Sequence, residues 1–242
     1  MDSLQEALRE LVIANRILAR EGVVDAFGHV SVRHPDNPER FLMSRSRAPE
    51  LITLDDLIEF KLDGEAIDLR DRTPYGERFI HGAVLEARPD INSVIHNHAY
   101  ELIPFGNTNT PLLPMMHTCG VIGADINFWD IRDQFGETDH LVVNMEQGRD
   151  LAKTLGDRRV TLMKRHGCVV AGSNIKEAVN IAVYLQVNAK IQLQAIAMGG
   201  AIDNLTPGEV DLCTQRQFSP LGMDRAWEYW SLRAGADRLF GD

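Results

Sequence analysis

The chain has 242 residues, of which 44% are hydrophobic and 25% are charged. This composition is that of an ordinary globular protein, and a chain of this length buries a sizeable core without disulfides or a structural metal. The formal net charge is −10, from 25 Lys and Arg against 35 Asp and Glu. Such a balance disfavours nucleic-acid binding, which requires basic patches, but local arginines can still attract a small anionic substrate.

The cysteines Cys119, Cys168 and Cys213 are widely spaced and form no CxxC motif. The N-terminus carries no signal-peptide pattern, so we expect a cytoplasmic location, where thiols stay reduced. No apolar run approaches the roughly 18 residues that a membrane-spanning helix needs, so no membrane partner is expected.

Helix signals begin near the N-terminus, where apolar residues recur at helical spacing over residues 3–20 and Ser3 with Glu6 forms a capping box. A second helix is predicted over residues 73–88, because the Thr-Pro pair at its start fits the cap and the first helical position. Further helices are expected near residue 100, at 147–155 and 174–198, from 206, and after 220.

Strand signals are short β-branched runs bounded by turns, at 27–34, 41–44, 91–98, 112–116, 141–144, 160–165 and 168–171. Because helices and strands interleave along the whole chain, we predict one α/β domain over residues 1–242. Several strands are separated by hairpin-length gaps, which favours a mixed sheet. The chain has neither a GxGxxG nor a GxxxxGK[ST] motif, so no direct signal supports a nucleotide-binding fold.

The strongest local signal is the segment VIHNH at residues 94–98. Residues two apart on a strand point to the same face, so His96 and His98 would project side by side and grip a transition metal. A pair of surface or core histidines would give the same pattern, so this motif alone leaves both interpretations open.

Two further residues could complete such a site. Glu77 falls in the first turn of the predicted helix, with His81 on the same helical face; the alternative is a carboxylate favoured by the helix N-terminus. His166 lies between two strand-like runs, where Gly167 permits a tight turn or a close ligand approach; the alternative is an exposed turn histidine. Three imidazoles and one carboxylate suit a divalent transition metal with open positions for Lewis-acid chemistry.

Taken together, five elements resemble the class II aldolase/adducin family, in the right order over residues 3–200. They are GHVSVR at 28–33, Glu77, RPD at 88–90, HNH at 96–98 and RHG at 165–167. The resemblance implies a three-layer α/β/α domain with a central mixed, mainly antiparallel sheet. It also implies a homotetramer with active sites at subunit interfaces, and a helical C-terminal segment, here residues 207–242, that caps the site.

Residue by residue, the family's metal ligands match His96, His98 and His166, and Glu77 matches an acidic residue that ligates the metal or acts as base. The resemblance therefore implies one divalent metal per subunit: zinc, manganese, iron or cobalt. Adducin keeps the fold as a non-catalytic interaction module. The intact ligand set here favours an enzyme.

The segments that bind phosphate in the family's sugar-phosphate aldolases differ in this chain. Gly-Asn is replaced by Gly-His at 28–29, the Thr/Ser-Gly turn by SRSR at 44–47, and Ser-Ser by Tyr-Gly at 75–76. The two arginines offer guanidinium forks suited to a carboxylate, with plain surface charge as the alternative. The candidate substrate-binding residues are Ser44, Arg45 and Arg47.

The family's aldolases also carry a tyrosine after a histidine as a proton donor, whereas this chain has His117-Thr118. That change, with APEL at 48–51, resembles the family's aromatic hydroxy-acid decarboxylases. Glu77, His117 and His29 are the candidates for proton transfer, and a structural role is the alternative for His29. The sequence thus predicts a metal-dependent decarboxylase of a hydroxylated aromatic or heteroaromatic carboxylate or dicarboxylate. The alternative enzyme is an aldolase acting on a hydroxy-keto acid or a sugar (phosphate).

Overall fold

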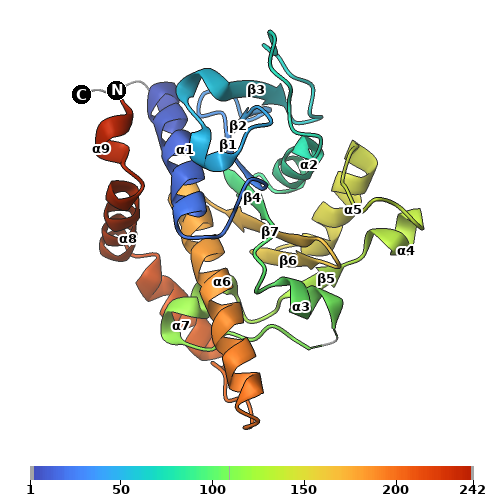
Figure 1. Cartoon of the computed structure of the whole chain (residues 1–242), viewed down its shortest axis with the longest axis vertical. Coiled ribbons are helices and arrows are strands. Elements are labelled where there is room, and N and C mark those ends of the chain that lie inside the picture. The colour runs from blue at the N-terminus through green and yellow to red at the C-terminus, as the bar shows by residue number, and fades with distance from the viewer. Residues whose placement is uncertain (1–2, 109, 241–242) are drawn as a thin grey trace.

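The computed structural model describes residues 3–108 and 110–240, which form a single α/β domain around a seven-stranded sheet. The strand order is β3-β2-β1-β4-β7-β6-β5 (Figure 1). Neighbouring strands are antiparallel except β5 and β6, which run parallel. The predicted single-domain fold with a mixed, mainly antiparallel sheet is therefore confirmed.

The strands are β1 (His29–Arg33), β2 (Arg40–Ser44), β3 (Leu57–Lys61), β4 (Ser93–Asn97), β5 (Asn127–Trp129), β6 (Val160–Met163) and β7 (Gly167–Gly172). The α-helices are α1 (Ser3–Arg20), α2 (Arg78–Ala87), α3 (Ile103–Asn107), α4 (Ile131–Phe135), α5 (Met145–Leu155), α6 (Ile175–Ala197), α7 (Pro207–Gln217), α8 (Pro220–Arg233) and α9 (Ala236–Leu239). A 3-10 helix, η3, spans His117–Ile122.

Two hydrophobic cores lie on opposite faces of the sheet, because successive strand residues point to opposite sides. Ile95 and Val170 pack with apolar residues of α1 and α6. Their neighbours Val94 and Val169 pack with apolar residues of α2 and α5. Figure 1 shows the same three layers, with α1 and α6 on one side of the sheet and α2 and α5 on the other.

The central strands bring the candidate ligands together. Strand β4 pairs with β1 on one side and β7 on the other, and His29 lies directly opposite His96 in the β1–β4 register. His98 follows the end of β4, and the turn between β6 and β7 carries His166. Helix α2 packs on β4, so its first residues lie beside the same strand.

The helix predicted over 73–88 is wrong at its start, since α2 begins only at Arg78. Residues 73–75 are extended because they pair with the 45–46 segment: Pro74 forms a bridge with Arg45, and the amide of Ser46 donates to the carbonyl of Thr73 at 2.8 Å. Glu77 therefore immediately precedes the helix instead of lying in its first turn.

Two predicted strands, 112–116 and 141–144, are also absent. Over 112–116, the amides of Leu113 and Met115 donate to the side chains of Gln192 and Asn188 on α6, at 2.8 and 2.7 Å, instead of to a strand. The amides of 142–143 donate to the carboxylate of Glu77 and the side chain of Gln147. Strands β3 and β5 were not predicted; both are short, and long-range pairing stabilises them.

Helices α7 to α9 form the C-terminal segment. Helix α8 packs against α1 and α6, and Trp230 is buried in the core on that face. In the single chain this segment therefore lies along the α1/α6 layer (Figure 1), and the capping of the site by residues 207–242 stays a prediction. Among the described helices, none has the length and apolarity needed to cross a membrane.

Candidate metal centre

Four side chains converge at the end of β4. Glu77, His96, His98 and His166 each offer one ligand atom, and these atoms all lie within 4.8 Å of one another. Nε2 of His96 is 2.9 Å from Nε2 of His98 and 3.5 Å from Oε2 of Glu77. Nε2 of His166 is 3.6 Å from Oε1 of Glu77. The structure thus brings together all four residues that the sequence singled out as ligands.

The backbone fixes the orientation of the His96 ring. Its Nδ1 lies 3.0 Å from the carbonyl oxygen of Cys168 on β7, and a carbonyl oxygen can only accept a hydrogen bond. Nδ1 therefore carries the proton, and the lone pair of Nε2 faces the other three ligands. Metal-binding histidines in proteins are held in the same way by their second ring nitrogen.

A close approach between strands places His166. A Cβ atom on Gly167 would stand 2.1 Å from the carbonyl oxygen of Asn97 and 3.0 Å from Cδ2 of His98, so only glycine fits. Arg165, just before His166, has a φ of 62°, which tightens the turn between β6 and β7. Of the two roles expected for Gly167, the structure shows the tight turn, and the group that approaches it closely is the backbone of β4.

Glu77 is a buried carboxylate that accepts a hydrogen bond from the amide of Val142 at 3.1 Å. Burial raises the pKa of Glu77, but the adjacent His96, His166 and His29 outweigh burial and hold it below its ordinary value. Within the described residues its ion-pair partners are His96 and His166, with no lysine or arginine. A buried negative charge of this kind needs a cation.

The four residues fit a divalent transition metal. Burial lowers the pKa of both His96 and His98, so these rings are neutral near pH 7 and their nitrogen lone pairs are available. Bonds of about 2.0–2.2 Å to one ion place ligand atoms about 3–4 Å apart, close to the separations here. A bound cation would also neutralise the carboxylate of Glu77.

A second group of buried side chains lies behind the cluster, on the α2 side. Nδ1 of His29 is 2.7 Å from Nε2 of His81, and Nδ1 of His81 is 2.7 Å from Oγ of Ser31. The His29 ring also packs on the rings of His96 and Tyr75, with centroids 5.1 and 4.6 Å apart. Burial lowers the pKa of His81 to about 3, so this ring is neutral.

The candidate substrate-binding segment, residues 44–47, lies next to this group. The hydroxyl of Tyr75 donates to the carbonyl of Arg47, while the Tyr75 ring packs on His29. Nε of Arg45 and Nη1 of Arg47 donate to the two oxygens of Asp56, at 2.5 and 2.8 Å. Both guanidiniums remain about a third exposed and share one carboxylate, which sequence reasoning missed. Ser44 is fully buried.

His117 lies apart from the cluster. It is the exposed first residue of η3, and η3 packs against α6 and α7. Within the described chain no hydrogen bond, ion pair or ring contact joins His117 to the four ligands, so its role in proton transfer stays a prediction that requires a neighbouring subunit.

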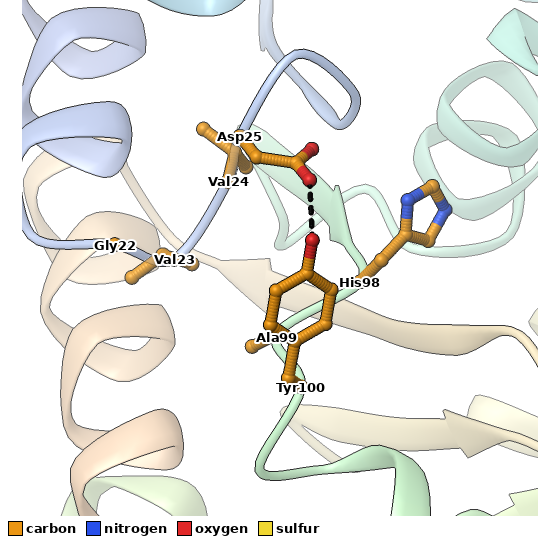
Figure 2. A pocket seen from close by; sticks show the side chains of 7 residues that line it. All are labelled: Gly22, Val23, Val24, Asp25, His98, Ala99 and Tyr100. Atoms are coloured by element: carbon orange, nitrogen blue, oxygen red, sulfur yellow. Dashed lines mark hydrogen bonds between the residues drawn. The ribbon is translucent and has the colours of Figure 1, made fainter.

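A small cavity of about 30 Å³ borders His98. Figure 2 shows that the Asp25 carboxylate and the Tyr100 hydroxyl meet beside His98, and their oxygens are 2.8 Å apart. Asp25 also accepts a hydrogen bond from the amide of Phe27 at 2.8 Å, which holds the loop before His29. The sequence did not single out either residue, although Asp25 stands four positions before His29 and Tyr100 two positions after His98.

Comparison with known proteins places this fold and site in a family. The family model "Class II Aldolase and Adducin N-terminal domain" matches residues 9–193. The chain therefore belongs to the class II aldolase and adducin family, as its sequence motifs predicted.

Two curated relatives carry decarboxylase names. The chain is 32% identical to "Decarboxylase tropJ" of Talaromyces stipitatus, over 92% of each chain. It is 26% identical to "3,4-dihydroxyphthalate decarboxylase" of Arthrobacter keyseri, over 84% of each. Among solved structures, an aldolase II superfamily protein from Pseudomonas syringae superposes with a TM-score of 0.82, covering 99% of this chain and 96% of that one at 21% identity.

Proposed function

We propose that the protein is a metal-dependent carbon–carbon lyase, and more specifically a non-oxidative decarboxylase of a hydroxylated aromatic or heteroaromatic carboxylate. The observation that carries the proposal is the convergence of Glu77 with three histidines at one point. The names of the two decarboxylase relatives support the finer assignment. One divalent metal per subunit, zinc, manganese, iron or cobalt, would be held by His96, His98, His166 and Glu77.

The reaction breaks the bond between a ring carbon and its carboxylate. The electron pair stays on the ring carbon, CO2 leaves, and a proton is then added to that carbon. A bound metal supplies Lewis-acid stabilisation of the negative charge that develops on the substrate. Arg45 or Arg47 binds a carboxylate of the substrate through its guanidinium fork. Glu77, His29, or His117 of a neighbouring subunit delivers the proton.

We further propose that the protein acts in the cytoplasm as a homotetramer with sites at its subunit interfaces. Exposed His117 and the C-terminal helices are the parts of the chain that such an interface would bring to a neighbouring site. Light scattering tests the oligomeric state, and a monomer at working concentration would contradict this part of the proposal.

Metal analysis is the first test. After reconstitution with zinc, the wild type is expected to hold about one equivalent per chain, whereas His96→Ala holds less than about a tenth. His34→Ala is the matched control, because His34 lies at the far end of β1 beside Glu59 and is expected to leave the metal content unchanged. Equal metal contents in wild type and His96→Ala would defeat the enzyme proposal and favour an interaction module.

Product analysis is the second test, with 3,4-dihydroxyphthalate as the probe. Release of CO2 with formation of a dihydroxybenzoate supports a decarboxylase. An aldolase acting on a hydroxy-keto acid or a sugar phosphate is the second candidate, because the family model itself is named after aldolases. Release of an aldehyde from such a compound, without CO2 from any aromatic acid, would replace the decarboxylase proposal.

A further inference from the structure

The segment of residues 110–116 runs along α6 and pairs with no strand of the described sheet. Two buried side chains of α6 hold it instead. Oδ1 of Asn188 accepts from the amide of Met115 at 2.7 Å, and its Nδ2 donates to the carbonyl of Leu113 at 2.8 Å. Oε1 of Gln192 accepts from the amide of Leu113, and its Nε2 donates to the carbonyl two positions earlier, both at 2.8 Å. Each side chain therefore binds the segment as a neighbouring strand would, with one donor and one acceptor.

The spacing of these two side chains explains the fit. Asn188 and Gln192 are four residues apart on α6, a rise of about 6 Å along the helix. The backbone groups that they bind recur at every second residue, about 6.6 Å apart in an extended chain. The residue between them, Pro114, uses its carbonyl to accept from the amide of Leu205 instead, at 2.9 Å. Both amide side chains are almost fully buried, at 0% and 1% exposure, so water does not compete for these hydrogen bonds.

The held segment leads directly into His117, the exposed first residue of η3. The other end of η3 is fixed as well, because the hydroxyl of Thr214 on α7 donates to the carbonyl of Gly120 at 3.0 Å. Among the described residues, no hydrogen bond, ion pair or ring contact involves the side chain of His117. The backbone on its two sides therefore sets the point from which this imidazole projects.

We infer that Asn188 and Gln192 are positioning residues, which hold residues 110–116 against α6 so that His117 projects from a fixed point toward the site of a neighbouring subunit. The inference rests on the proposed function, in which His117 of a neighbouring subunit is a candidate for proton transfer, and it adds the groups that place this imidazole. Proton transfer requires the donor within hydrogen-bond reach of the reacting carbon. A displacement of about 1 Å at the start of η3 therefore slows the reaction.

Hydrogen exchange tests the attachment of the segment without any turnover. Asn188→Leu keeps a side chain of similar size that cannot pair with the backbone, so the amide of Met115 and the carbonyl of Leu113 lose their partner. In the full-length, zinc-loaded protein we expect the peptide covering residues 110–117 to exchange at least about 10-fold faster than in wild type. Gln194→Leu is the matched control, because Gln194 lies on the same helix with its side chain exposed. Unchanged exchange in Asn188→Leu would overturn the inference.

Metal content and kinetics separate positioning from damage to the metal centre. Asn188→Leu and Gln192→Leu replace no ligand and are each expected to hold about one zinc per chain. With 3,4-dihydroxyphthalate, each is expected to lose roughly 10- to 100-fold in kcat at a nearly unchanged KM, because a misplaced proton donor slows the reaction without weakening substrate binding. Gln194→Leu is expected to keep wild-type kinetics. Wild-type kcat in Asn188→Leu, with His117→Ala impaired, would overturn the inference.

Mixed oligomers show in which subunit the defect lies. An Asn188→Leu subunit keeps its metal ligands and displaces only its own His117, whereas a His96→Ala subunit keeps His117 in place and lacks a ligand. The two chains are co-expressed with different tags and purified on both. Random assembly is expected to restore about a quarter of wild-type activity. Activity no higher than that of Asn188→Leu alone would place the defect in the variant's own site and overturn the inference.

Failure of the proposed function gives a different result. If the wild type releases an aldehyde from a hydroxy-keto acid and no CO2 from an aromatic acid, the decarboxylase proposal fails, and the same kinetic and mixing tests with that substrate decide the inference. If the chain releases neither product, the proposed function fails. Faster exchange over residues 110–117 in Asn188→Leu would then still support the attachment of this segment by the two amide side chains.

Discussion

Gly167 and Asn97 approach each other so closely that a methyl group on Gly167 would stand 2.1 Å from the Asn97 carbonyl oxygen. Asn97 ends β4 and pairs with Cys168 on β7, so Gly167 lies one position along from this pair. Asn97 directly precedes His98, and Gly167 directly follows His166. The separation between two strands therefore sets the separation between two candidate ligands.

We predict that Gly167→Ala weakens zinc binding by roughly 10- to 100-fold, because the added methyl group pushes the β6–β7 turn and His166 away from His98. The clash is also expected to cost about 1–3 kcal/mol of unfolding free energy. Zinc titration calorimetry and urea unfolding measure the two effects. Gly208→Ala is the control, since a Cβ there meets no atom within 4 Å. Similar zinc affinities in the two variants would contradict this account.

Each of the four candidate ligands has a local signal in the sequence, and the family resemblance joined them into one set. Strand alternation predicts that His96 and His98 share a face, and Gly167 marks the turn that carries His166. The place of Glu77 was less predictable. The Thr-Pro pair at 73–74 signals a helix start, but pairing with the 45–46 segment extends those residues instead.

Contacts between distant segments left no such signal. Asp56 binds Arg45 and Arg47 from eleven and nine residues away, respectively, and His81 contacts His29 across 52 residues. No spacing rule links such positions, because a contact of this kind depends on how the sheet and α2 are stacked. The same holds for β5, whose three residues form a strand only because β6 lies beside them.

Tyr75→Phe tests the connection between the arginine segment and the histidines. The substitution keeps the ring that packs on His29 but removes the hydroxyl, which donates to the carbonyl of Arg47 and accepts from its amide at 3.3 Å. We expect a loss of about 1–2 kcal/mol in unfolding free energy, the usual cost of two such hydrogen bonds. We also expect a higher KM for 3,4-dihydroxyphthalate with nearly unchanged kcat. A lower kcat at constant KM would show that Tyr75 acts on the reacting atoms instead.

Asp56 predicts a specific pH dependence of stability. Burial raises its pKa, but hydrogen bonds from Arg45, Thr53 and Arg47 outweigh burial and lower the pKa from 3.8 to about 2. A carboxyl whose pKa falls on folding stabilises the protein above its unfolded pKa, and this contribution is lost as the pH falls through the folded value. We expect Asp56→Asn to cost on the order of 1–2 kcal/mol at pH 7, with the difference from wild type shrinking between about pH 4 and 2.

The measurement is urea unfolding of metal-free wild type and Asp56→Asn across this pH range. Glu65→Gln is the control, because Glu65 forms an exposed ion pair with Lys61. Its substitution is expected to change stability by less than about 1 kcal/mol at any pH. A difference between wild type and Asp56→Asn that stays constant from pH 7 to 2 would show that the arginine contacts do not stabilise the ionised carboxyl.

The proposed sharing of sites between subunits predicts that two inactive variants complement each other. His96→Ala lacks a metal ligand, and His117→Ala lacks the exposed histidine that would reach a neighbouring site. Each alone is expected to be inactive or nearly so. When both variants are co-expressed, mixed oligomers form. A site regains activity where a His117→Ala subunit, which keeps its metal ligands, lies beside a His96→Ala subunit, which keeps His117. Random assembly gives about a quarter of the sites this arrangement, and therefore about a quarter of wild-type activity. Tagging the two chains differently and purifying on both tags isolates the mixed oligomers. If the mixed oligomers are no more active than oligomers of His117→Ala alone, His117 plays no part in the site of a neighbouring subunit.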